Sequence, residues 1–278
     1  MIRPFPAILL SIALLLSLSP PRLHAQASEI PSAAPPPTPG ETSEQRGRNL
    51  LDQMVTALGG QAWLNRTTIQ LEGRGASFFQ GKPNLGVVEY REFRRLPASG
   101  QPEADRIEFS KKHDVIQVWT STSGTEITYK GISPLPKDQV EDTLRRRAHS
   151  IEEVIHTWIH APGVVVIYEG TRMVERHITD KVTILTDNND AVTLDLDTTS
   201  HLPQRRTFLW RNQQFKDQDE DAEEYDDYHA VQGLPTAMTI TRYHNGDMLS
   251  QRYITKVVYN EALAPSLFDP TIPLNKKK

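Results

Sequence analysis

The sequence has 278 residues, with 35 acidic and 31 basic side chains, and it contains no cysteine. Without cysteine there can be no disulfide framework, so a folded domain has to be held together by its own core. The slight acidic excess argues against a nucleic acid partner, because phosphate binding requires clustered positive charge.

The first residues are typical of an export signal. Arg3 precedes an apolar segment, residues 7–18, and Leu23-His24-Ala25 supplies a small residue for cleavage after Ala25. The alternative is an uncleaved membrane anchor, which needs roughly 20 apolar residues, whereas this segment has 12. We therefore expect residues 1–25 to be removed and the mature protein to be soluble in the periplasm.

The remaining chain divides by composition into three parts. Residues 26–42 are rich in proline and alanine, and we expect them to form an extended linker without a core. Residues 43–273 show neither an internal repeat nor a further linker, which predicts a single domain. Residues 274–278 form a short basic tail.

The predicted domain begins with an amphipathic helix. Thr42 and Gln45 match a capping box, apolar residues follow at helical spacing over 50–58, and Gly59-Gly60 ends the helix. Alternating apolar and polar residues then predict strands at 67–71, 85–93, 105–109, 115–121 and 126–130.

Residues 137–160 change to helical periodicity and predict two helices, the second capped by Ser150 with Glu153. About seven strands follow, and Asn245-Gly246 predicts a tight hairpin turn near the end. Runs of strands interrupted by helices predict an α+β fold with a mainly antiparallel sheet. So few helices can cover only one face of so large a sheet.

Two charged segments stand out in this pattern. Residues 217–227 contain eight acidic side chains, and we expect a solvated loop there. The alternative is a site for a basic partner or for Ca²⁺, although the spacing lacks the Asp-x-Asp-x-Asp-Gly register. Arg145-Arg146-Arg147 is expected to be a solvated basic run that could touch anionic lipid headgroups.

No pattern for catalysis or for a cofactor is present. The sequence lacks a Gly-x-Ser-x-Gly elbow and a glycine-rich phosphate loop. His156 and His160 have the spacing of two metal ligands on a helix, but there is no His-Glu-x-x-His motif and no third histidine nearby. We predict a non-enzymatic protein without metal or cofactor, and an uncharacterised hydrolase is the alternative.

Short motifs at turns and strand ends occur along nearly the whole folded region. They are Ala57-Leu58-Gly59-Gly60, the strand 67–71, Asp197-x4-Leu202-Pro203, Tyr225-Asp226-Asp227-Tyr228, Gly233-Leu234-Pro235, Tyr259-Asn260 and Leu267-Phe268. Together they resemble the outer-membrane lipoprotein-sorting proteins of the LolA-like class. This resemblance implies a strongly curved, incomplete β-barrel whose concave face is covered by helices, with residues 50–58 and 151–159 over a cavity for acyl chains.

The resemblance also implies a function. We expect a periplasmic, monomeric, non-catalytic carrier of lipid or of lipoprotein acyl chains, with an envelope membrane protein as a further possible partner. The alternative is a protein-binding or envelope-stress regulatory module of the same fold. Inward-facing aromatic residues either pack as core or line a cavity, and we favour the cavity. The expected lipid-binding residues are Phe109, Trp119, Trp158, Leu51, Val55 and Ile155.

Overall fold

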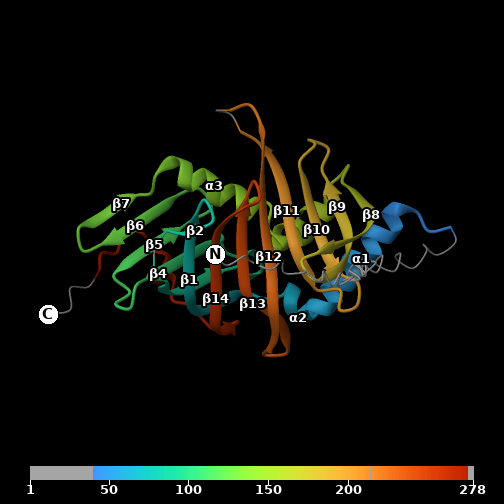
Figure 1. Ribbon diagram of the computed structural model, residues 1–278. Coiled ribbons are helices and arrows are strands. Elements are labelled where there is room, and N and C mark those ends of the chain that lie inside the picture. The colour runs from blue at the N-terminus through green and yellow to red at the C-terminus, as the bar shows by residue number, and fades with distance from the viewer. Residues whose placement is uncertain (1–39, 85, 213–214, 275–278) are drawn as a thin grey trace, which may run out of the picture. The chain divides into compact units, whose positions relative to one another are not determined.

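The computed structural model describes residues 40–84, 86–212 and 215–274, which belong to one compact unit (Figure 1). The expected export signal, most of the expected linker and residues 275–278 lie outside the described residues. Within the described ranges, the structure has no helix that is both long and apolar enough to cross a membrane.

In the described residues, four α-helices and three short 3-10 helices interrupt a succession of strands. The helices are α1 (Ser43–Leu58), α2 (Gln61–Leu64), α3 (Lys137–Ala148), α4 (Ile151–His156), η1 (Pro97–Ser99), η2 (Trp158–His160) and η3 (Pro265–Phe268). The strands are β1 (Thr68–Phe79), β2 (Lys82–Pro83), β3 (Val88–Arg95), β4 (Ala104–Phe109), β5 (Val115–Trp119), β6 (Gly124–Thr128), β7 (Gly131–Pro134), β8 (Val165–Val174), β9 (His177–Leu185), β10 (Ala191–Asp197), β11 (Pro203–Arg211), β12 (Gln218–Val231), β13 (Leu234–His244) and β14 (Asp247–Tyr259).

All strands join one curved antiparallel sheet, in the order β7-β6-β5-β4-β3-β1-β14-β13-β12-β11-β10-β9-β8, with β2 beside β1. The described sheet ends at β7 and β8, so the barrel is open. The chain reaches one edge at β7 and enters the sheet again at the opposite edge, β8. The segment between them, residues 135–164, therefore has to cross the sheet, and it carries α3 and α4 over the concave face. The predicted fold class is confirmed.

Two helix caps and one turn form as the local sequence predicted. The Thr42 hydroxyl accepts a hydrogen bond from the Gln45 N–H, and the Gln45 side chain accepts one from the Thr42 N–H, which completes the capping box. The Ser150 hydroxyl caps α4 by accepting from the backbone N–H three residues later. Asn245 and Gly246 both have positive φ and join β13 to β14 in a two-residue turn.

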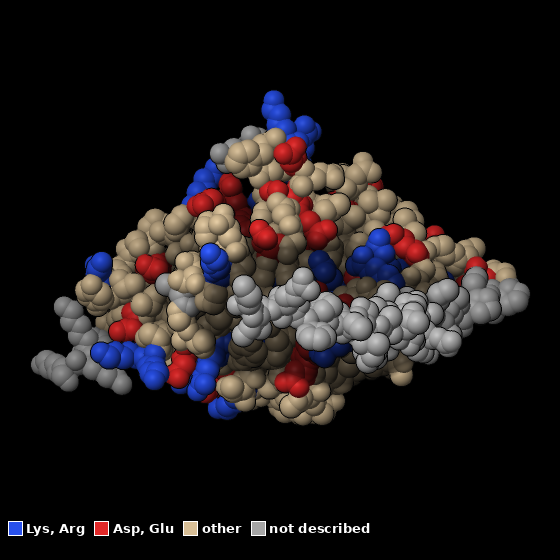
Figure 2. Space-filling model, viewed as in Figure 1, with Lys and Arg blue, Asp and Glu red and all other residues tan. Residues whose placement is uncertain are grey.

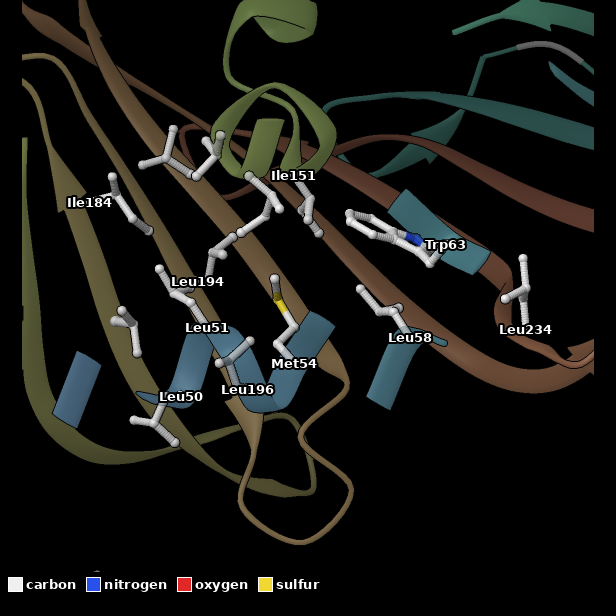
Figure 3. Close-up of a cluster of buried hydrophobic side chains, with 14 of the residues drawn as sticks. Leu50, Leu51, Met54, Leu58, Trp63, Ile151, Ile184, Leu194, Leu196 and Leu234 are labelled. Carbon is white, nitrogen blue, oxygen red and sulfur yellow. The ribbon is translucent and has the colours of Figure 1, made fainter. Parts of the chain in front are cut away.

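The main core lies between the helices and the sheet. Leu50, Met54 and Leu58 of α1 belong to one buried cluster with Leu194 and Leu196 of β10 (Figure 3), and Leu50 and Met54 are fully buried. α4 adds three more buried apolar side chains to the same cluster. Gly47 allows the close approach of α1 to β8, since a Cβ there would lie 2.8 Å from Cγ1 of Val166.

A smaller apolar cluster lies on the opposite face of the sheet. It consists of Ile116, Val118 and Ile127, and Leu274 packs against it. The C-terminal segment is also fixed by Arg106 of β4, whose Nη1 donates a hydrogen bond to the Leu267 carbonyl at 3.2 Å. The segment after β14 thus returns over the outer face of β4–β6.

Two predictions about charged segments are wrong. Residues 218–227 of the expected acidic loop are part of the 14-residue strand β12. Arg145, Arg146 and Arg147 are not solvated, since only 24%, 20% and 11% of their side chains are exposed. Ion pairs account for much of both results. Carboxylates in the middle of the acidic segment pair with arginines of neighbouring strands, and Arg147 pairs with Asp105 of β4, whereas Asp217, Asp226 and Asp227 remain exposed.

The buried stripe of α1 supplies a stability prediction. Leu50→Ala removes a fully buried side chain and leaves a cavity, so we expect the free energy of unfolding to fall by about 2 to 5 kcal/mol. Gln53→Ala is the matched control, because Gln53 is exposed on the same helix and should change stability by less than about 0.5 kcal/mol. Urea unfolding followed by circular dichroism measures both variants. Equal losses for the two variants would contradict this assignment of the core.

Candidate functional site

The helices do not fill the whole concave face. α1 packs against β8, β9 and β13, whereas the region formed by β1, β3, β4, β13 and β14 keeps an open groove of about 550 Å³. Apolar, small and charged residues line it, and they come from these strands, β12 and α3. The lining residues are Val88, Tyr90, Ile107, Phe109, Ile240, Gly75, Ala76, Ser77, Gly86, Ser250, Gln251, Glu92, Arg146, Glu223, Arg242 and Arg252.

The groove is hollow because β1 carries very small residues beneath it. A Cβ atom added to Gly75 would meet no neighbouring atom closer than 4.0 Å, so the missing side chain leaves free space. Gly73 is two residues away and faces the same side, but it has another role. A Cβ there would lie 2.4 Å from the Tyr253 carbonyl oxygen, so Gly73 permits close strand packing at a bulge.

One end of the groove is closed by a polar cluster around Arg252. Its Nε donates to the Tyr90 hydroxyl at 3.2 Å, and its Nη2 pairs with the Glu92 carboxylate. Burial raises the pKa of Tyr90. Glu92, Arg252 and Ile240 also line a second cavity of about 150 Å³ beside α2 and α4. These three side chains therefore lie between the two cavities.

The opposite wall of the groove is charged. Arg242 of β13 donates through Nη2 to Asp142 of α3 at 3.1 Å and to Asp221 of β12 at 3.2 Å. Arg146 pairs with the same Asp142 carboxylate. Burial tends to raise the pKa of Asp142, but the charges of the two arginines outweigh it, so this pKa is lowered. The Asp142 carboxylate of α3 thus pairs with two guanidinium groups at the groove.

Glu223, beside Arg242 on the neighbouring strand, is held by other partners. Nη2 of Arg206 lies 3.0 Å from its carboxylate, and the Tyr225 hydroxyl donates to it at 3.0 Å. Burial tends to raise the pKa of Glu223. The charges of Arg206 and Arg146 and the Tyr225 hydrogen bond outweigh burial and lower this pKa to about 2. Glu223 is therefore ionised at neutral pH, and its carboxylate is already bound by Arg206 and Tyr225.

α3 (labelled in Figure 1) has no buried residue, and charged groups attach it to strands on both sides of the groove. Arg147 donates to Asp105 of β4 at 2.7 Å, and the Arg145 guanidinium lies 3.5 Å from the ring centre of Trp210 in β11. Arg206 donates to the carbonyl oxygen of His149, directly after the helix, at 2.7 Å. α3 thus bridges two halves of the sheet across the groove.

The six residues expected to bind lipid do not lie together. Phe109 lines the groove. Leu51 and Ile155 are buried in the main core, and Val55 and Trp158 pack against it. Trp119 is buried next to Gly124, whose small size makes room for the indole ring. The charged and small residues of the groove were not among the predicted site residues, although the Gly75-Ala76-Ser77 run in β1 is a signal that could have indicated the groove.

Other kinds of site find less support. On the face drawn in Figure 2, acidic and basic side chains are interspersed and do not form a large patch of one sign. His156 stacks on the Trp63 ring, with 6.2 Å between ring centres. In the part of the chain that the structure describes, no group of three or more histidine, aspartate or glutamate side chains is placed to hold a metal ion.

No family model and no curated protein matches the sequence. Solved structures do match the fold. A DUF1329 family protein from Desulfovibrio piger has a TM-score of 0.58 and 9% identity over 82% of this chain and 98% of that chain. A protein described as an outer membrane lipoprotein-sorting protein domain, from Vibrio parahaemolyticus, has a TM-score of 0.52 and 8% identity, covering 81% of this chain and 97% of that chain.

A LolA superfamily protein from Nitrosomonas europaea has a TM-score of 0.48 and 10% identity, over 80% of this chain and 97% of that chain. Identities of about one residue in ten speak for the fold alone. The chain has the LolA-like fold that its short motifs indicated.

The Glu223 cluster predicts a loss of stability in acid. An unfolded glutamate has a pKa of about 4.3, and the folded value is lowered to about 2. The charged form therefore stabilises the fold fully above the unfolded pKa, and this contribution is lost as the pH falls from about 5 toward 2. Glu223→Gln should flatten the fall in unfolding free energy over this range, measured by urea titration at several pH values.

Glu141→Gln removes an exposed carboxylate of α3 and controls for the loss of one negative charge. If Glu223→Gln kept the wild-type pH dependence, the ion pair with Arg206 would not be the source of the acid sensitivity.

Proposed function

We propose that this protein is a periplasmic carrier that holds the acyl chain of a lipid or lipoprotein in the groove under α3. The observation that carries the proposal is the open groove of about 550 Å³ with an apolar wall of Val88, Ile107 and Phe109. Burial of a methylene group contributes about 0.8 kcal/mol. A groove of this kind can therefore retain an acyl chain by burial alone, without a chemical step.

Two further findings support a carrier. The groove is open on one side, so an acyl chain can enter without unfolding of the main core, which is packed separately under α1 and α4. The fold is shared with a protein described as an outer membrane lipoprotein-sorting protein domain. The export signal expected at residues 1–25 would bring the chain to the compartment where such cargo crosses between membranes.

A second candidate function is binding of a protein segment at the sheet edge. β8 is an edge strand of ten residues and exposes the apolar side chains of Val165 and Met173. An extended peptide can add to such an edge through main-chain hydrogen bonds. This candidate predicts that binding depends on β8 and is indifferent to changes in the groove.

Gly75→Leu tests the carrier proposal. The groove has room for the new side chain, and leucine favours a strand more than glycine does, so the variant should fold. We expect it to displace at least two methylene groups of the ligand and to weaken binding of a fluorescent long-chain fatty acid by about tenfold or more. Fluorescence titration measures the dissociation constant.

Arg74→Leu is the matched control, because it adds the same side chain to the same strand at an exposed position on the opposite face. We expect its affinity to equal that of the wild type. Native mass spectrometry of the mature protein from its own envelope adds a direct test. An empty protein that also ignores added fatty acids and phospholipids would overturn the carrier proposal and leave the edge-binding candidate.

A further inference from the structure

The charged wall of the groove has unused capacity to donate hydrogen bonds. Arg242 lines the groove, and all three of its side-chain hydrogen bonds leave from the single nitrogen Nη2. Its Nε is buried and, within the described part of the chain, has no hydrogen-bond partner. A buried donor without a partner is costly, because it has lost its hydrogen bonds to water and gained none in return. The guanidinium group of Arg242 thus has donor capacity that its present partners do not use.

The same wall brings two positive charges together. Arg146 of α3 also lines the groove, and it shares the Asp142 carboxylate with Arg242. Burial and the charge of Arg242 lower the pKa of Arg146, so the two guanidinium groups repel each other in spite of their common partner. A second anion close to both arginines would relieve this repulsion.

The anions already nearby cannot fully take this role. The charge of Glu223 offsets part of that of Arg146 and Arg242, but the hydrogen bonds of its carboxylate come from Arg206 and the Tyr225 hydroxyl. Asp221 accepts from the Trp210 indole N–H at 3.0 Å in addition to Arg242. The protein thus presents two neighbouring guanidinium groups to a cavity whose other wall is apolar.

We propose that the groove selects amphiphiles with an anionic head, a carboxylate or a phosphate, which binds Arg146 and Arg242 while the acyl chain lies along Val88, Ile107 and Phe109. The guanidinium group suits this role because its planar set of donors matches both kinds of oxyanion. This inference rests on the proposed carrier function and names the chemical class of the cargo.

Matched ligands test the inference. A fatty acid, an alkyl phosphate and a fatty alcohol of equal chain length differ only in the head group, and isothermal titration calorimetry gives the affinity of each. We expect the wild type to bind at least one of the two anionic ligands about tenfold or more tightly than the alcohol. The order of the fatty acid and the alkyl phosphate then shows which oxyanion the site prefers. The preference should shrink at high salt, because ions screen the charges.

Variants of the arginines assign the effect. Arg242→Gln should reduce the ratio of anion to alcohol affinity to near one, whereas Arg242→Lys, which keeps the charge but lacks Nε, should give an intermediate ratio. Arg146→Gln repeats the test on α3 in case loss of the Asp221 partner unfolds the first variant. Arg205→Gln is the matched control, since this arginine of β11 pairs with Glu220 and Glu224 on the opposite face and lies outside the groove.

The outcomes separate the two proposals. If no ligand binds the wild type, the carrier function itself is wrong. If the alcohol binds as tightly as the anions, the carrier function stands and the anionic head is overturned. A preference that survives in both Arg242→Gln and Arg146→Gln would also overturn it.

Discussion

The chain leaves the sheet at one edge strand and enters it again at the other, and this constraint shapes the concave face. Residues 135–164 have to span the whole width between β7 and β8. The second part of this segment, α4, joins α1 in an apolar core against β8–β11. The first part, α3, has no buried residue. It is held instead by Arg147 and Arg145, which reach β4 and β11, and by Asp142, which pairs with Arg242 of β13. One crossing segment is thus fixed by two different kinds of interaction.

This difference explains why a groove remains under α3 and not under α1. Leucine and methionine side chains of α1 fill the space down to the sheet, because apolar packing is stable only when voids are few. Ion pairs act through long side chains and keep the helix at a distance from the sheet. Since removal of one partner of a buried pair is strongly destabilising, the network fixes α3 in position without closing the space beneath it. Small residues of β1 enlarge that space.

The two proposals follow from the two walls of this groove. Val88, Ile107 and Phe109 of β3 and β4 form an apolar wall that suits an acyl chain. The wall formed by β12, β13 and α3 carries two guanidinium groups, and that of Arg242 has an unused donor. An amphiphile combines these properties in one molecule. Arg146 and Arg242 would then serve both to hold α3 and to receive cargo, so binding and the position of the crossing helix would be coupled.

The sequence by itself determined the local features and the fold class. The Thr42 capping box, the Ser150 cap and the Asn245-Gly246 turn each depend on residues within one turn of one another, and strand alternation needs only neighbouring residues. Tertiary structure alone decided the charged pairs and the groove. Arg242 meets Asp142 across 100 residues, and Arg206 meets the carbonyl of His149 across 57. Such contacts depend on strand order and on the path of α3, which no local pattern encodes. The acidic segment was expected to form a loop because its sequence alone does not show the arginines that pair with it. Those arginines come from other segments of the chain, and residues 218–227 lie in strand β12.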